Sequence, residues 1–177
     1  MIMFIRWKRI AFKVAAGCFA LAAVPGNTQT AGADSDLDMP FTIGIHHVGL
    51  AVTDLDASTR FFVDGLGWQL GGRDPSYPAA FVTDGAVLVS LWQVEDPANA
   101  TAFNRRRNVG LHHLALEVAD TETLNHLHKR LSRMKGVRVE FSPEPNRGGP
   151  TIHMMVYEPS GNRIEFTVPG GRSLLRD

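Results

Sequence analysis

One strand-like pattern occurs twice in this chain, and it constrains the fold more than any other feature. The first copy, residues 45–54, reads Ile-His-His-Val-Gly-Leu-Ala-Val-Thr-Asp. The second copy, residues 111–120, reads Leu-His-His-Leu-Ala-Leu-Glu-Val-Ala-Asp. Each copy is an apolar run that ends at an aspartate able to cap a following helix. The repeat therefore predicts two similar modules in tandem.

The two faces of each predicted strand differ, because successive side chains of a strand point to opposite sides. One face is aliphatic and suits a core; it carries Val48, Leu50 and Val52 in one copy and Leu114, Leu116 and Val118 in the other. The second face starts with His47 or His113 and continues with small residues, Gly49, Ala51 and Ala115. We expect this second face to leave room for a ligand near a histidine.

Composition excludes several classes of protein. Of the 177 residues, 44% are hydrophobic and the formal net charge is zero, so nothing indicates a nucleic-acid partner. Cys18 is the one cysteine, which excludes an intrachain disulfide and a thiolate zinc site.

The first 33 residues have the layout of a secretory signal. A basic segment from Arg6 to Lys13 precedes the short apolar run at 14–24. The small residues Ala-Gly-Ala at 31–33 then offer a cleavage site. This predicts an exported protein, periplasmic or secreted, with no stable membrane span after processing. An uncleaved N-terminal anchor, which would leave the protein attached to a membrane, is the alternative.

The rest of the chain divides into segments that match the repeat. We expect a disordered lead-in at 34–42, one domain at 43–169 and a tail at 170–177. Within the domain, modules at 43–94 and 110–169 flank a linker at 95–109. Each module reads as strand, helix and three strands, with turns such as Asp84-Gly85 between strands. The predicted fold class is α+β, with two βαβββ modules forming a curved, barrel-like mixed sheet and helices outside.

A third candidate ligand lies on the last predicted strand. There, Ile164, Phe166 and Val168 form the apolar face, and Glu165 points to the other side, toward the histidine-bearing face. Two imidazoles and one carboxylate are a common ligand set for a divalent first-row metal with open positions. We predict a metal site of His47, His113 and Glu165. The alternative for Glu165 is a surface carboxylate paired with Arg163.

Residues 43–168 resemble the vicinal oxygen chelate superfamily. The resemblance rests on the opening from His47 to Trp68 and on the ending 157–166, Tyr-Glu-Pro-Ser-Gly-Asn-Arg-Ile-Glu-Phe. That superfamily includes glyoxalase I, fosfomycin-resistance thiol transferases, extradiol dioxygenases and bleomycin-resistance proteins. It implies a divalent ion (Fe, Mn, Ni or Zn) on His47, His113 and Glu165, with no further cofactor-binding residues. His46 and His112 fall on the other face and are interpreted as structural.

The chain departs from each subfamily in particular positions. Glyoxalase I carries a fourth ligand, a glutamate, where this chain has Ser90. The transferases carry a threonine where this chain has Gly49 and a tyrosine where it has Met155. The resemblance therefore implies a small substrate bound through neighbouring oxygens, with lyase, isomerase or dioxygenase chemistry, and leaves the reaction open.

Other residues have two open interpretations each. His153 is either a catalytic base in the groove or a polar residue near a strand end. Arg105–Arg107 either attracts an anionic substrate or is a solvated linker, and Arg147 belongs to a mobile rim or a plain surface loop. Trp68 and Trp92 would be stacking surfaces if the protein were instead a metal-free binder of small molecules. The sequence leaves open whether the groove forms within one chain or in a homodimer.

Overall fold

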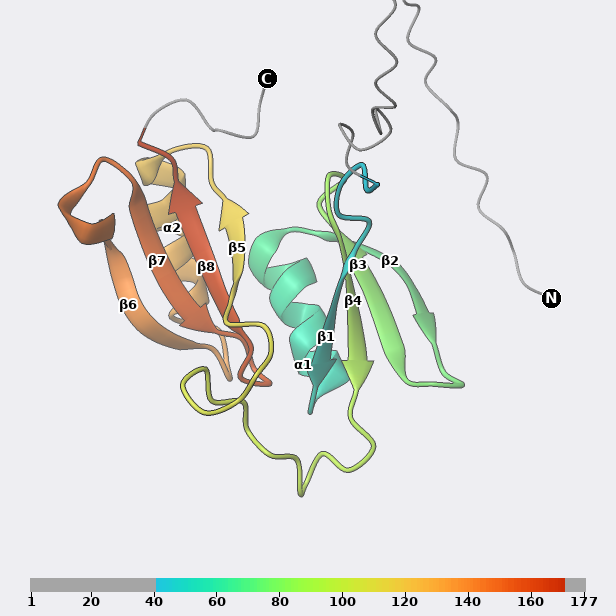
Figure 1. Ribbon diagram of the computed structural model, residues 1–177. Helices are drawn as coiled ribbons and strands as arrows, with labels where there is room; N and C mark the ends of the chain where they lie inside the picture. The colour runs from blue at the N-terminus through green and yellow to red at the C-terminus, as the bar shows by residue number, and fades with distance from the viewer. Residues whose placement is uncertain (1–40, 171–177) are drawn as a thin grey trace, which may run out of the picture. The chain divides into compact units, whose positions relative to one another are not determined.

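The computed structural model describes residues 41–170, in which two βαβββ modules follow one another (Figure 1). The first module consists of β1 (Val48–Val52), α1 (Leu55–Arg60), the π-helical turn η1 (Phe61–Gly65), β2 (Gln69–Asp74), β3 (Ala79–Thr83) and β4 (Leu88–Gln93). The second consists of β5 (Leu114–Glu117), α2 (Thr121–Leu131), β6 (Arg138–Pro145), the 3₁₀ turn η2 (Asn146–Gly148), β7 (Ile152–Tyr157) and β8 (Arg163–Val168).

The two modules have the same sheet topology. The strand orders are β1-β4-β3-β2 and β5-β8-β7-β6. The first strand of each module pairs in parallel with the last, and the remaining pairs are antiparallel. This confirms the α+β class and the tandem repeat. The sheets are two curved halves, and β1 and β5 are each an edge strand of one half.

Both repeated aspartates cap the helices that follow them. Asp54 Oδ1 accepts a hydrogen bond from the Ala57 amide at 2.8 Å, and Asp120 Oδ1 accepts one from the Thr123 amide at 2.7 Å. An aspartate at this position satisfies an amide that the helix itself leaves unpaired. The end of each repeated motif therefore fixes where the chain leaves the strand and begins the helix.

The core lies between the sheets and their helices. Leu50, Val52 and Val89 are almost completely buried, as the aliphatic face of the repeat predicts. A Cβ added at the buried Gly65 would lie 3.1 Å from Met134 Sδ and 3.2 Å from Leu131 Cδ2, so the end of η1 packs tightly against the end of α2. Residues of both modules belong to one continuous hydrophobic cluster.

The strands that carry the repeated histidines begin later than the sequence predicts. Both histidine pairs fall inside the strand-like repeats at 45–54 and 111–120, but β1 starts at Val48 and β5 at Leu114. Pairing in the two parallel ladders begins with Val48 opposite Val89 and with Leu114 opposite Ile164. His47 and His113 thus lie in the segments that lead into the strands.

The predicted signal at 1–33 lies outside the described residues, as does most of the predicted tail. Within residues 41–170, no helix combines the length and the apolar character needed to span a bilayer.

Candidate functional site

Two of the three predicted metal ligands lie in contact. Nε2 of His113 is 3.1 Å from Oε2 of Glu165. Ala115 is the ladder partner of Glu165 in the parallel β5–β8 pair, and its small side chain leaves this space open. The Glu165 side chain is 14% exposed, so its carboxylate is largely shielded from solvent. The exposure and geometry make this pair a candidate ligand site.

His153 reaches the other oxygen of the same carboxylate. Its Nδ1 lies 2.5 Å from Glu165 Oε1, and its ring lies against Phe141 with ring centroids 4.9 Å apart. The antiparallel pairing of β7 and β8 places His153 opposite Thr167, two residues from Glu165 on the same face. His153 therefore belongs to the same cluster, with Nδ1 engaged by the carboxylate.

The His47 ring is hydrogen-bonded to a residue outside this cluster. Its Nδ1 is 2.8 Å from Nδ1 of His46, the residue before it. Among the described residues, no three His, Cys, Asp or Glu side chains are grouped so as to hold a metal ion. The complete set of His47, His113 and Glu165 therefore stays a prediction.

His112, interpreted from the sequence as structural, contacts a predicted ligand directly. Its Nδ1 lies 2.7 Å from Nδ1 of His113 and 3.3 Å from Nη1 of Arg163. Desolvation, with the nearby Arg163 and His113, lowers the pKa of His112 and so favours its neutral ring. The neutral ring can accept a hydrogen bond at Nδ1.

An ion-pair network that sequence reasoning missed borders the cluster. Glu140 accepts from Arg163 Nε at 2.8 Å and from Arg105 Nη2 at 3.0 Å, so Arg163 is the partner of Glu140 rather than of Glu165. Arg105 Nη1 also donates to the Tyr157 hydroxyl at 3.0 Å. The first arginine of the linker run therefore anchors the linker to the second module. Glu140 gave no sequence signal, because its partners come from residues 35 and 23 positions away.

Charge and burial oppose one another in this network. Burial acts to raise the pKa of Glu140, but hydrogen bonds from Arg163 and Tyr157 and the charges of both arginines outweigh it and hold the pKa below its ordinary value. Burial likewise opposes the charge of Arg163, and the hydrogen bond and charge of Glu140 nevertheless raise its pKa. Both groups are therefore ionised at neutral pH.

In the first module, the sheet face that corresponds to the Glu165 face of the second module carries aromatic rings. Trp92 lies against Tyr77 and Phe81, with ring centroids 5.1 Å and 5.8 Å apart. The Trp92 indole N–H donates to Ser90 Oγ at 2.9 Å, so the residue at the position of the glyoxalase I glutamate holds a tryptophan ring. Tyr77 is 60% exposed, which leaves this aromatic cluster accessible.

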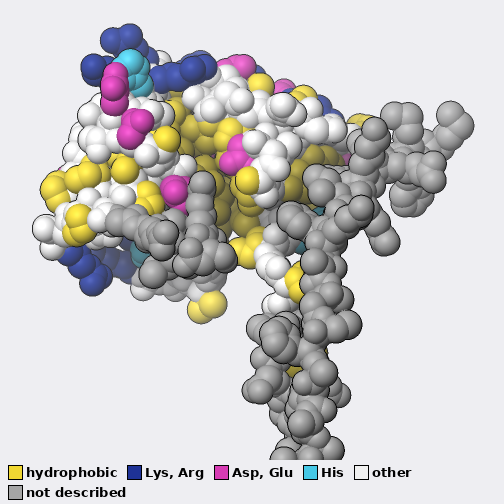
Figure 2. All heavy atoms as spheres, turned by 90° about the horizontal axis from the view of Figure 1, so that it is seen from above, with side chains coloured by type: hydrophobic (Ala, Val, Ile, Leu, Met, Phe, Trp, Pro, Cys, Tyr) yellow, Lys and Arg dark blue, Asp and Glu magenta, His cyan; other side chains and the backbone are white. Residues whose placement is uncertain are grey.

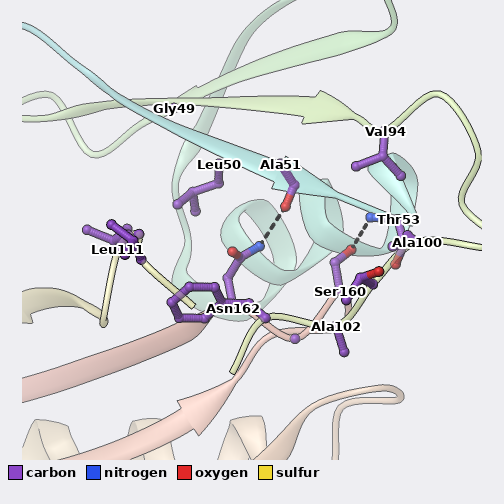
Figure 3. A pocket seen from close by; sticks show the side chains of 15 residues that line it. Gly49, Leu50, Ala51, Thr53, Val94, Ala100, Ala102, Leu111, Ser160 and Asn162 are labelled. Atoms are coloured by element: carbon purple, nitrogen blue, oxygen red, sulfur yellow. Dashed lines mark hydrogen bonds between the residues drawn. The ribbon is translucent and has the colours of Figure 1, made fainter. Parts of the chain in front are cut away.

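A cavity of about 420 Å³ lies beside the β1 edge (Figure 3). The linker, β1 and the turn between β7 and β8 line it. Asn162 Nδ2 donates to the Ala51 carbonyl at 3.0 Å, and the Thr53 amide donates to Ser160 Oγ at 3.0 Å across it. Another face of the molecule, seen from above in Figure 2, shows hydrophobic side chains gathered together with acidic side chains beside them. His113 and Glu165 do not line the cavity, so it is not the candidate ligand site.

The chemistry of the donor pair fits a metal ion. At 3.1 Å, Nε2 of His113 donates a hydrogen bond to Oε2 of Glu165 when it carries a hydrogen; without that hydrogen, both atoms present lone pairs that a cation could share. Two ligand atoms that each bind one first-row ion at about 2.1 Å lie roughly 3 Å apart when their bonds meet near a right angle. His113 and Glu165 are therefore spaced as neighbouring ligands would be.

Comparison with known proteins agrees with the fold and with the resemblance. The model of the glyoxalase/bleomycin resistance protein/dioxygenase superfamily matches residues 44–166. Lactoylglutathione lyase of Haemophilus influenzae is 30% identical over 133 residues, covering 69% of this chain and 90% of that protein. The 2-epi-5-epi-valiolone epimerase of an Actinomyces species is 28% identical over 156 residues, covering 77% and 79%.

Solved structures share the fold at lower identity. A glyoxylase/bleomycin resistance protein/dioxygenase domain from Frankia sp. EAN1pec superposes with a TM-score of 0.62 at 23% identity, covering 73% of this chain and 93% of that one. Lactoylglutathione lyase from Agrobacterium tumefaciens gives a TM-score of 0.56 at 21% identity, covering 74% and 97%. The chain belongs to the glyoxalase/bleomycin resistance protein/dioxygenase superfamily, which is the vicinal oxygen chelate superfamily.

Proposed function

We propose that this protein is a metal-dependent enzyme of the superfamily, in which His47, His113 and Glu165 hold a divalent ion that binds neighbouring oxygens of a small substrate. The contact of 3.1 Å between His113 Nε2 and Glu165 Oε2 supports the proposal, because it brings together two residues that the sequence predicts separately, His113 from the repeat and Glu165 from the alternation of the last strand. When bound, such an ion would stabilise negative charge on a substrate oxygen. The relatives that match include a lyase and an epimerase.

The chain's own residues would supply binding and proton transfer. Nδ1 of His153 contacts Oε1 of Glu165, the carboxylate oxygen that does not contact His113. This contact would orient the His153 ring and leave its Nε2 to accept a substrate proton. The neighbouring arginine network would favour a substrate that carries a negative charge. We therefore place proton abstraction next to an anionic or enolisable carbonyl group within this function.

His47 would complete the site from a second copy of the chain. In the structure His47 bonds to His46, and β1 and β5 are both edge strands with unpaired backbone groups. Ile43 and Val109, which precede these strands, are fully exposed apolar side chains. A homodimer would cover both the edges and the apolar residues.

Metal content tests this function. Protein purified without an affinity tag should retain a divalent ion, and His113→Ala and Glu165→Gln should abolish retention. His126→Ala is the matched control, because His126 lies on the exposed face of α2. An ion retained equally by all three variants, or by none including the wild type, would remove the proposal.

Mixing two inactive variants tests the shared site. When His47→Ala and Glu165→Gln chains are denatured and refolded together, a site shared across a dimer gives one intact site in each mixed dimer. A site made within one chain gives none, because each chain then carries a defect. Recovery of bound metal in the mixture would support the homodimer, and its absence would place all three ligands in one chain.

The aromatic cluster supports a second candidate, a metal-free binder of small molecules. Tyr77, Phe81 and Trp92 form an accessible stacking surface, and Ser90 takes the place of a further metal ligand. Under this function, a flat ligand would bind equally well to the wild type and to Glu165→Gln. Binding that disappears in Glu165→Gln would instead favour the metal-dependent enzyme.

A further inference from the structure

The edge of β1 that faces away from β4 carries backbone groups in a regular pattern. In a parallel ladder, every second residue directs both its N–H and its C=O to the neighbouring strand. The Val94 amide donates to the Val52 carbonyl at 2.9 Å, so Val52 and Leu50 are the residues that bond to β4. Gly49 and Ala51, which alternate with them, therefore direct their backbone groups away from the sheet.

Side chains of the second module bond to one end of this edge. Asn162 Nδ2 donates to the Ala51 carbonyl at 3.0 Å, and Ser160 Oγ accepts from the Thr53 amide at 3.0 Å (Figure 3). Among residues 41–170, no such partner reaches the Ala51 amide or the backbone groups of Gly49. The Gly49 carbonyl and the Ala51 amide together match the C=O and N–H of one residue in an extended chain.

The cavity of about 420 Å³ lies along these open groups. Its volume falls in the range of small-molecule sites, about 300–1,000 Å³. Of the described residues, the 15 that line it include no Asp, Glu, Lys, Arg or His, although 20% of the chain is charged. A charged ligand would lose water there without gaining a partner of opposite charge, so the lining favours a neutral molecule.

The linker and the residues before β5 supply apolar contacts to the same cavity. Phe103, Val109 and Leu111 all line it. A Cβ added to Gly110 would lie 3.0 Å from Cε2 of Phe103, so the phenyl ring rests directly on the glycine backbone. An apolar group of a ligand can therefore be buried here while a polar group bonds to the β1 edge.

We propose that this cavity binds a neutral small molecule with one peptide-like unit and an apolar side chain, as in an acylated amino acid amide. The N–H of the ligand donates to the Gly49 carbonyl, and its C=O accepts from the Ala51 amide. Its side chain packs against Phe103 and Leu111. The site lies outside the pair of His113 and Glu165, so it goes beyond the proposed function and requires no metal ion.

Titration of the metal-free full chain with N-acetyl-leucinamide, followed by ¹H–¹⁵N spectra, tests the proposal. This probe is neutral and carries both the peptide-like unit and an apolar side chain. The amide signal of Ala51 should shift, with a Kd on the order of millimolar because the probe is small. N-acetyl-leucine, which has a carboxylate in place of the terminal amide, should bind at least about tenfold more weakly.

A third probe removes the donor alone. N-acetyl-N-methyl-leucinamide lacks the N–H that bonds to the Gly49 carbonyl, so it should bind roughly 3–10-fold more weakly than N-acetyl-leucinamide. Equal affinity for all three probes would overturn the proposal, and so would shifts confined to residues outside the cavity.

Two variants change the site from the protein side. Ala102→Phe fills the cavity and should abolish binding of N-acetyl-leucinamide, whereas Ala98→Phe, on the same linker but outside the lining, should retain it. Ala51→Pro removes the amide, which an edge strand tolerates where the N–H faces away from the ladder, and should weaken binding roughly 3–10-fold. If Ala51→Pro does not fold, as judged by circular dichroism, Ala102→Phe and the N-methyl probe still decide the outcome.

Two further measurements separate this site from the proposed function. Glu165→Gln should bind N-acetyl-leucinamide as the wild type does, so a protein that binds the probe but retains no metal keeps this site and loses the proposed function. A second copy paired along β1 would occupy the same backbone groups, so saturating probe should shift any dimer towards monomer in analytical ultracentrifugation. A dimer that persists with an unshifted Ala51 amide would overturn the proposal.

Discussion

The hydroxyl of Ser58 donates a hydrogen bond of 2.6 Å to Oε2 of Glu158, and both side chains are almost completely buried. Ser58 lies on α1 of the first module, and Glu158 lies in the turn between β7 and β8 of the second. The other carboxylate oxygen accepts from the backbone and the side chain of Asn162. The turn motif that carries part of the family resemblance thus also joins the two modules.

Removing this hydroxyl should destabilise the protein. Ser58→Ala leaves a buried carboxylate oxygen without its donor, which we expect to lower the free energy of unfolding by about 1–3 kcal/mol. Urea denaturation followed by circular dichroism measures it. Ser76→Ala is the matched control, because the Ser76 hydroxyl also donates to a carboxylate at 2.6 Å but does so in an exposed turn. Equal effects in the two variants would contradict the role of Ser58.

The ionised carboxylate of Glu140 should stabilise the folded state at neutral pH and lose this effect at acidic pH. Arg163 and Tyr157, through their hydrogen bonds, overcome burial and hold the folded-state pKa of Glu140 below its ordinary value of 4.5. The folded state therefore favours the ionised form more than the unfolded state does, and this stabilisation is complete above about pH 4.5. It is lost as pH falls through the lowered folded-state pKa.

Thermal melts from neutral to acidic pH measure this dependence. The difference between the wild type and Glu140→Gln should be largest near neutral pH and should shrink below about pH 4.5. The exposed Glu144 of the same strand provides the control, Glu144→Gln. A difference for Glu140→Gln that stays constant across the pH range would show that the carboxylate charge contributes nothing.

His153 should affect turnover more than metal binding. Its Nδ1 bonds to Glu165 Oε1, while the pair that we assign to the metal uses Oε2. His153→Asn should therefore lower kcat by roughly 10²–10⁴-fold, as expected for loss of a general base. Metal content should remain close to that of the wild type. Loss of the ion along with activity would identify His153 as a ligand, and His128→Asn on α2 is the control.

Trp92 should report the binding of flat ligands. Trp68 is buried in the core, whereas Trp92 is half-buried and lies against the exposed Tyr77 ring. A phenol or aromatic acid that stacks there should quench Trp92 fluorescence, and Trp92→Phe should lose the quenching while keeping most of the affinity. Trp92→Leu should weaken binding by about 0.5–1.5 kcal/mol. Quenching that persists in Trp92→Phe would locate the ligand elsewhere.

The two histidines that precede β5 differ in how well the alternation of side chains predicts their contacts. The alternation of side chains placed His113 and Glu165 on one face, and they lie in contact. The same alternation assigned His112 to the opposite face. However, β5 begins only at Leu114, so His112 and His113 precede the strand and their rings meet. Alternation holds only where a ladder imposes it, and sequence alone did not locate the start of that ladder.

The repeat by itself determined the two modules, their capped helices and the buried face of each strand, because these depend on local periodicity and on side chains close in sequence. Only the tertiary structure decided that Arg163 pairs with Glu140, that His153 reaches Glu165 and that Arg105 anchors the linker. Those contacts join residues from separate strands, and their distances depend on register and twist, which no local pattern specifies.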